Sequence, residues 1–183
     1  MLDRSPQRKA LIPKVTFIGA ESTGKSTLSL KVAAHLGATW IPEYGRLYCE
    51  QVRSVVDQRD MDLIVLGQMA LEDWGMRHAP RLLVCDTDVL TSCIWNERYF
   101  NHYPDWMSRE FEKRRSDLFL VCDIDLPWVA DDIRDSGGER RRWFHRRFLE
   151  ELRARHLPHV LVSGNYAERF HRALTAVEQH SLV

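Results

Sequence analysis

One segment constrains the fold more than any other: Gly-Ala-Glu-Ser-Thr-Gly-Lys-Ser at positions 19–26. It matches the G-x-x-x-x-G-K-[ST] pattern of a phosphate-binding loop, or P-loop. The apolar run Lys14–Ile18 precedes it as an expected buried strand, and residues 27–36 follow it as an expected helix. The strand–loop–helix context that a P-loop requires is therefore present, and a glycine-rich turn without a ligand is the less favoured interpretation.

A P-loop binds phosphate because its backbone N–H groups turn inward and the N-terminus of the next helix adds a positive field. Lys25 would reach the β- and γ-phosphates, and the Ser26 hydroxyl would hold Mg²⁺. The residues expected to bind the nucleotide in this loop are Gly19, Glu21, Ser22, Thr23, Gly24, Lys25, Ser26 and Thr27.

Short apolar runs alternate with amphipathic stretches along the whole chain. The expected strands are Val15–Ile18, Thr39–Ile41, Leu82–Cys85, Leu118–Cys122 and His159–Val162. The expected helices are Lys25–Leu36, Leu47–Val56, Met61–Arg77, Val89–Tyr99, Trp106–Arg115, Glu139–His156 and Tyr166–Gln179. This alternation predicts a five-stranded parallel sheet with helices on both faces. With the P-loop and the arginines that follow the fourth strand, the expected fold is an α/β P-loop NTPase with an arginine-rich lid. We expect one domain over residues 1–183, of which residues 1–13 form a flexible N-terminal extension.

Charge and composition exclude several classes of partner. The chain carries 26 basic and 26 acidic residues, so no global field attracts nucleic acid or a membrane surface. No apolar run approaches the length of a membrane span, and neither the four cysteines nor the eight histidines have the spacing of a zinc site. We expect a cytoplasmic protein with reduced thiols. An apolar face on Met61–Trp74 would suit either the core or a homo-oligomer.

Acidic residues follow the third expected strand. Asp86 leaves the strand at the edge of the sheet that also carries the P-loop, which is the place of a Walker-B acid that holds Mg²⁺ directly or through water. Asp88 has two interpretations, the N-cap of the next helix or a role in the acceptor site, and the cap is favoured.

The segment Pro42–Arg46 follows the second expected strand and contains three groups that could bind an acceptor. Glu43 could accept the proton of an attacking hydroxyl, and Arg46 could hold a substrate oxygen or phosphate. Tyr44 could stack on a ring. The alternative is a surface loop with an ordinary ion pair.

The fourth expected strand is followed by a segment rich in aromatic, acidic and arginine residues, 123–135. Residues 134–155 then contain eight arginines and no lysine. Arginines in this position suit a lid over transferring phosphates, and the candidates are Arg134 and the cluster Arg140–Arg142. The alternative is a solvated basic helix face, and we expect both kinds of arginine.

Two further helix starts are recognisable. Residues 136–139 read Ser-Gly-Gly-Glu, an S-x-x-E capping box, and the helix it opens has a packing face that includes Trp143, Phe144, Phe148 and Leu152. Asn165 follows the fifth expected strand, where it would either border the adenine of ATP or cap the last helix, as Ser163 also could.

Together these motifs resemble the kinase domain of NadR-type proteins. The resemblance rests on residues 19–26 with Glu-Tyr-Gly-Arg at 43–46, Asp-Thr-Asp at 86–88 and Trp-Val-Ala-Asp-Asp-Ile-Arg at 128–134, and it covers about Lys14 to Gln179. It implies ribosylnicotinamide kinase activity, in which ATP with Mg²⁺ phosphorylates the 5′-hydroxyl of nicotinamide riboside to nicotinamide mononucleotide in NAD salvage. Because only 18 residues precede Gly19, we expect a stand-alone kinase domain with neither adenylyltransferase nor repressor activity.

The motifs and the resemblance assign roles to particular residues. The expected catalytic residues are Lys25, Glu43, Asp86 and Arg134, and Arg140 and Asn165 join the P-loop in binding ATP. The expected acceptor site consists of Glu43, Tyr44, Arg46, Asp88, Trp95, Trp128 and Asp132, and the expected Mg²⁺ ligands are Ser26 and Asp86. Whether Glu43 or Asp86 orients the attacking hydroxyl is left open. The aromatic residues among them could recognise the cationic nicotinamide ring by cation–π contact.

Two other functions fit the same sequence. The chain could be a kinase for another nucleoside or small metabolite, or a regulatory P-loop ATPase whose arginine-rich face binds a macromolecular partner. A guanine-specific N-K-x-D motif does not occur in the sequence, which favours ATP as the nucleotide.

Overall fold

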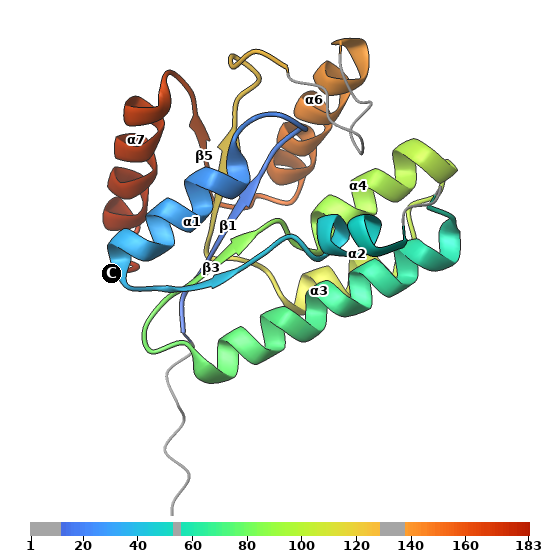
Figure 1. Ribbon diagram of the computed structural model, residues 1–183, viewed down its shortest axis with the longest axis horizontal. Helices are drawn as coiled ribbons and strands as arrows, with labels where there is room; N and C mark the ends of the chain where they lie inside the picture. The colour runs from blue at the N-terminus through green and yellow to red at the C-terminus, as the bar shows by residue number, and fades with distance from the viewer. Residues whose placement is uncertain (1–11, 53–55, 129–137) are drawn as a thin grey trace, which may run out of the picture.

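The structure, a computed structural model, describes residues 12–52, 56–128 and 138–183 (Figure 1). Its strands are β1 (Lys14–Ile18), β2 (Thr39–Ile41), β3 (Leu83–Asp86), β4 (Leu118–Cys122) and β5 (His159–Val162). Its helices are α1 (Lys25–Leu36), α2 (Tyr44–Val52), α3 (Gln58–His78), α4 (Val89–Phe100), α5 (Asp105–Lys113), α6 (Gly138–Ala154) and α7 (Tyr166–Gln179). The five strands form one parallel sheet in the order β2-β3-β1-β4-β5, which confirms the predicted fold class.

Helices cover both faces of the sheet because its inner strands are apolar on both sides. Alternate residues of β4 separate cleanly: Leu118 and Leu120 belong to one core, with α1 and α7, whereas Phe119 and Val121 belong to the other, with α4, α5 and α6. Figure 1 shows α1 and α7 together on one side of the strands and α3 with α4 on the other. A smaller apolar cluster joins α3 to β2 and β3.

Helix α2 begins three residues before the expected start at Leu47, so Tyr44 and Arg46 lie on the helix, and the expected start was wrong. The reason is a tertiary contact. The Tyr44 backbone N–H donates to the side-chain oxygen of Gln68 on α3 at 2.9 Å, which satisfies a donor that the start of a helix leaves unpaired. A partner 24 residues away in the chain leaves no local sequence signal.

Helix α3 also begins earlier than expected. Asp57 caps it, because its carboxylate accepts from the backbone N–H groups of Arg59 and Asp60 while the Asp60 carboxylate accepts from the Asp57 N–H. This is a reciprocal capping box with aspartate in both positions. The capping box expected at residues 136–139 includes Ser136 and Gly137, which lie outside the described residues.

Helix α6 packs as its sequence predicts. Phe144, Phe148 and Leu152 are fully buried against the core, and Trp143 packs beside them. On the flank of the same helix, Glu151 accepts hydrogen bonds from Arg147, Arg155 and Tyr103, and the two arginines also contact Glu97 and Glu112. Burial raises the pKa of Glu151, but its hydrogen bonds to Arg155 and Arg147 outweigh burial and leave the pKa lowered.

Two residues of the expected flexible extension pack on the fold. Ile12 and Pro13, part of the expected extension, contact the fold, since the Pro13 carbonyl accepts from the Leu83 N–H at 2.9 Å and Ile12 packs on the smaller core. On α3, Leu63, Leu66 and Trp74 are about half exposed, and a homo-oligomer through this face stays a prediction. Among the described residues, no helix combines the length and the apolar character needed to cross a membrane.

Candidate active site

The P-loop connects β1 to α1 and encloses a small groove. The groove has a volume of about 90 Å³ and is lined by residues 22–27. Gly24 is the N-cap of α1 with φ +75°, in the left-handed region that glycine adopts without strain. The Thr23 hydroxyl donates to the Ala20 carbonyl at 2.9 Å and ties the loop to itself.

The register of the sheet brings both predicted carboxylates to this groove. Asp86 pairs with Phe17 in the β1–β3 ladder, and Ile41 pairs with Cys85 in the β2–β3 ladder, so the ends of β1, β2 and β3 lie side by side. Glu43 follows β2, and its Oε2 lies 3.8 Å from Lys25 Nζ. The carboxyl edge of the sheet thus gathers the P-loop lysine, an acceptor-side acid and a strand-end acid.

Lys25 interacts electrostatically with both Glu43 and Asp86. Lys25 is 6% exposed; burial lowers its pKa, but the carboxylates of Glu43 and Asp86 outweigh burial and leave the pKa raised. Burial raises the pKa of Asp86 to about 6, while Lys25 and a hydrogen bond with the Ser26 side chain oppose the shift. The site therefore holds a cation between two carboxylates in a largely dry environment.

Ser26 and Asp86 fit the Mg²⁺ that a P-loop kinase uses. Asp86 is 1% exposed, and its Oδ1 is a buried oxygen without a hydrogen-bond partner. A hydroxyl and a carboxylate are the hard oxygen ligands that Mg²⁺ takes together with phosphate oxygens and water. In the described part of the chain no group of three or more His, Cys, Asp or Glu residues could hold a metal ion.

The remaining residues of the Glu-Tyr-Gly-Arg motif lie on α2. The positive charge of Arg46 partly opposes the raised pKa of Lys25 and of Asp86, and Arg46 Nη1 lies 3.9 Å from Glu50 Oε1. The ring of Tyr44 lies against Gly67 of α3, where a Cβ added to the glycine would be only 2.1 Å from Tyr44 Cε1.

Asp88 caps α4, as the favoured interpretation predicts. Its carboxylate accepts from the Thr91 N–H at 3.3 Å, while its other oxygen, Oδ2, is buried without a partner. Burial raises the pKa of Asp88 to about 7, with Lys14 opposing the shift. A role of Asp88 in acceptor binding stays a prediction.

The predicted aromatic residues lie in different surroundings in the described structure. Trp95 stacks on Tyr99, with ring centroids 5.1 Å apart, and packs against Phe144 between α4 and α6. Trp128 is 37% exposed at the end of the described segment after β4. Their contact with an acceptor stays a prediction. Asp132 and Arg134 lie outside the described residues.

Helices α6 and α7 carry Arg140 and Arg141 of the predicted lid cluster, the cap residue Asn165, and Arg169, which the sequence analysis did not name. Arg140 is half-buried at the start of α6, whereas its neighbour Arg141 is buried and hydrogen-bonded to the P-loop. Asn165 caps α7, accepting from the N–H groups of Ala167 and Glu168, in agreement with one of its two interpretations. Arg169, also on α7, is buried and reaches the P-loop.

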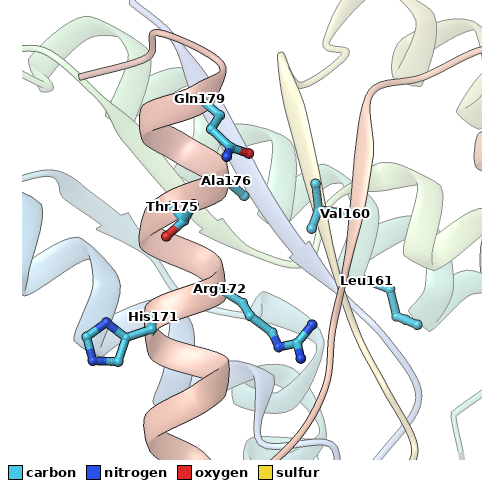
Figure 2. A pocket seen from close by; sticks show the side chains of 7 residues that line it. All are labelled: Val160, Leu161, His171, Arg172, Thr175, Ala176 and Gln179. Atoms are coloured by element: carbon cyan, nitrogen blue, oxygen red, sulfur yellow. The ribbon is translucent and has the colours of Figure 1, made fainter.

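A second and larger cavity lies away from this site. It has a volume of about 300 Å³ and lies between β5 and α7, the two elements that carry its lining residues (Figure 2). Its lining residues are Val160, Leu161, His171, Arg172, Thr175, Ala176 and Gln179. No predicted site residue belongs to it.

Comparisons with known proteins agree on the kind of fold. The AAA domain family matches residues 14–169. The trifunctional NAD biosynthesis/regulator protein NadR of Salmonella typhimurium is 29% identical over 171 residues, and the NadR of Escherichia coli is 29% identical over 173. In both cases the match covers 90% of this chain but only 42% of the relative.

Solved structures give the same picture. A NadR protein in complex with NR superimposes with a TM-score of 0.74 at 23% identity, covering 94% of this chain and 52% of that one. Deoxyadenosine kinase from M. mycoides (TM-score 0.62, 13% identity) and thymidylate kinase from Ehrlichia chaffeensis (0.63, 15%) match 91% of this chain over 98% and 97% of their own. At these identities the structural likeness shows the fold alone.

Proposed function

This chain belongs to the AAA domain family, and from that premise we propose that it is an ATP-dependent kinase that phosphorylates the 5′-hydroxyl of nicotinamide riboside. Its likeness to NadR and to nucleoside and nucleotide kinases supports the reaction class. The acceptor is proposed from the motifs shared with the NadR-type kinase domain. It is not taken from the activity of the whole relatives, because the match covers only 42% of each of them.

One observation carries the proposal: Glu43 Oε2 lies 3.8 Å from Lys25 Nζ. Lys25 is the P-loop residue that would hold the transferring phosphoryl group, and the proximity of Glu43 to it supports Glu43 as the group that orients the acceptor hydroxyl. Glu43 is also the less buried of the two carboxylates and follows β2, whereas Asp86 contacts Ser26. This division of labour favours Glu43 as the base and Asp86 as the metal ligand.

The reaction then needs little covalent help from the protein. The acceptor oxygen attacks the γ-phosphorus, the bond to the ADP oxygen breaks, and the hydroxyl proton passes to Glu43. Lys25 and the P-loop N–H groups stabilise the charge on the phosphoryl oxygens, and bound Mg²⁺ would neutralise further charge on them. Most of the rate enhancement comes from holding the two reactants in line.

The acceptor's positive ring gives a reason for acidic and aromatic residues nearby. A cationic nicotinamide ring is attracted to aromatic faces and to carboxylates. Tyr44, Trp95 and Trp128 are the aromatic residues that we propose for this contact, and Glu43 would supply a negative charge. Arg46 would bind ribose or phosphate oxygens rather than the ring.

The test measures ADP release with ATP and Mg²⁺ in a coupled assay, with and without nicotinamide riboside, and identifies the product by mass. Strong stimulation with formation of nicotinamide mononucleotide supports the proposal. Adenosine, deoxyadenosine and thymidine serve as matched acceptors. If one of these is preferred by kcat/KM, the kinase assignment stands and the acceptor is wrong; if no acceptor stimulates ADP release, a regulatory ATPase becomes the better explanation.

A further inference from the structure

Three consecutive backbone carbonyls of the P-loop, those of residues 21–23, accept hydrogen bonds from two buried arginines. Arg141 on α6 donates from Nε to the Glu21 carbonyl at 3.1 Å and from Nη2 to the Ser22 carbonyl at 3.0 Å. Its Nη1 donates to the carbonyl of Leu126 at 2.9 Å, in the segment after β4. The side chain is only 7% exposed, and each of these contacts is with a main-chain oxygen.

A second buried arginine donates to the next carbonyl along the P-loop. Arg169 on α7, 1% exposed, donates from Nη1 to the Thr23 carbonyl at 3.1 Å. It also reaches the Asp123 and Gly164 carbonyls and forms an ion pair with Asp125, whose other oxygen accepts from the Gly164 N–H at 2.6 Å. Burial and the nearby charge of Arg169 both lower the pKa of Arg141, which is consistent with two cations behind one loop.

Holding a carbonyl fixes the N–H of the same peptide unit. In a planar trans peptide the C=O and the N–H point in opposite directions. The carbonyls of Glu21, Ser22 and Thr23 therefore orient the N–H groups of Ser22, Thr23 and Gly24, and these three residues line the phosphate groove. A cation on the carbonyl side also polarises each peptide and strengthens its N–H as a donor.

We infer that Arg141 and Arg169 are positioning residues for the nucleotide phosphates: they grip three consecutive P-loop carbonyls and aim the opposite N–H groups into the groove. Neither side chain needs to touch the nucleotide. The inference deepens the nucleotide-binding part of the proposed function and does not depend on the acceptor.

The experiment uses the whole chain and inorganic tripolyphosphate and Mg²⁺–ADP as probes, with affinities measured by calorimetry. Arg141→Gln and Arg169→Gln are compared with Arg153→Gln and Arg172→Gln, which replace exposed arginines on the same two helices. We call Arg141→Gln and Arg169→Gln the clamp variants. Because hydrogen bonds to charged groups are the strong ones, each clamp variant should bind both probes about 10- to 100-fold more weakly, and the controls should bind like the wild type. Arg141→Lys should recover part of the loss.

A purely structural role for the arginines has a different signature. Val177→Ala empties part of the fully buried core under α7 and should lower the melting temperature without changing the loop. If the clamp variants lose no more phosphate affinity than Val177→Ala at a comparable melting temperature, the inference is overturned. In the kinase assay a positioning role raises the KM for ATP and lowers kcat, while the KM for the acceptor stays unchanged.

The outcome for the wild type separates this inference from the proposed function. Wild-type protein that binds neither probe overturns both. If the wild type binds both probes and the affinities of the clamp variants lie within twofold of it, only the positioning role of Arg141 and Arg169 is overturned. Weakened binding in both clamp variants but not in the exposed controls supports it, whatever the acceptor proves to be.

Discussion

Replacing Gly67 by alanine should destabilise the protein, although alanine normally stabilises the middle of a helix. Gly67 lies inside α3, where a change from glycine to alanine is worth about 1 kcal/mol in favour of folding. Here the new Cβ would be 2.1 Å from Tyr44 Cε1 and 2.4 Å from two other ring atoms. Non-bonded carbon atoms prefer about 3.5–4.0 Å, so the ring has to move by about 1.5 Å.

The size of the effect follows from these two opposing terms. Forcing one extra carbon into a packed contact costs about 1–3 kcal/mol, which exceeds the gain in helix propensity and leaves a net loss of about 1 kcal/mol. In a Tyr44→Ala background the obstacle is absent, and the same Gly67→Ala change should stabilise by up to about 1 kcal/mol. The sign of the effect therefore reverses, with a coupling of about 2 kcal/mol.

Equilibrium unfolding in urea of the wild type, both single variants and the double variant measures this cycle. Tyr44 directly follows Glu43, so the single Gly67→Ala variant should also raise the KM for the acceptor and leave ADP affinity unchanged. Equal stabilisation by Gly67→Ala in both backgrounds would refute the packing of Tyr44 on α3.

Three further predictions test other parts of the structure. Lys25→Ala should lower kcat by about 10²–10³ in the coupled assay, as loss of one preorganised charge contact does, and near-normal turnover would contradict the assignment. Asp88→Ala should lower the free energy of unfolding by about 1 kcal/mol because a helix N-cap is lost, whereas Asp88→Asn should keep most of it; urea unfolding distinguishes them. Glu151→Gln should be less stable than the wild type at neutral pH. Since Arg155 and Arg147 hold the pKa of Glu151 below its unfolded value, the difference should shrink as the pH falls from about 5 through the folded pKa, and a gap that is constant with pH would contradict this.

The strands and most helices could be predicted from the sequence because their signals are local. Each strand of the sheet is a short apolar run, and the predicted β4 and β5 have the bounds seen in the structure. The early start of α2 could not be predicted, since the acceptor that caps it comes from Gln68 on another helix. A local pattern cannot report a partner that only the folded chain supplies.

The same distinction divides the site. The P-loop and Asp86 were recognisable from contiguous residues, whereas the partners of Arg141 and Arg169 lie 119 to 146 residues away on the P-loop. A signal was nevertheless present. Arg141 shares the buried face of α6 with Phe144, Phe148 and Leu152, at spacings of three and four residues, and an arginine on an apolar face needs a buried partner.

The contact between Arg169 and the Thr23 carbonyl has a consequence for how the protein is made. Translation delivers the P-loop first, and the side chain that holds Thr23 emerges 146 residues later. A nascent chain that has not yet released α7 from the ribosome carries the phosphate-binding motif without the hydrogen bond from Arg169 to the Thr23 carbonyl. If Arg169 positions the P-loop as inferred above, tight phosphate binding requires that α7 has been synthesised and packed behind the loop.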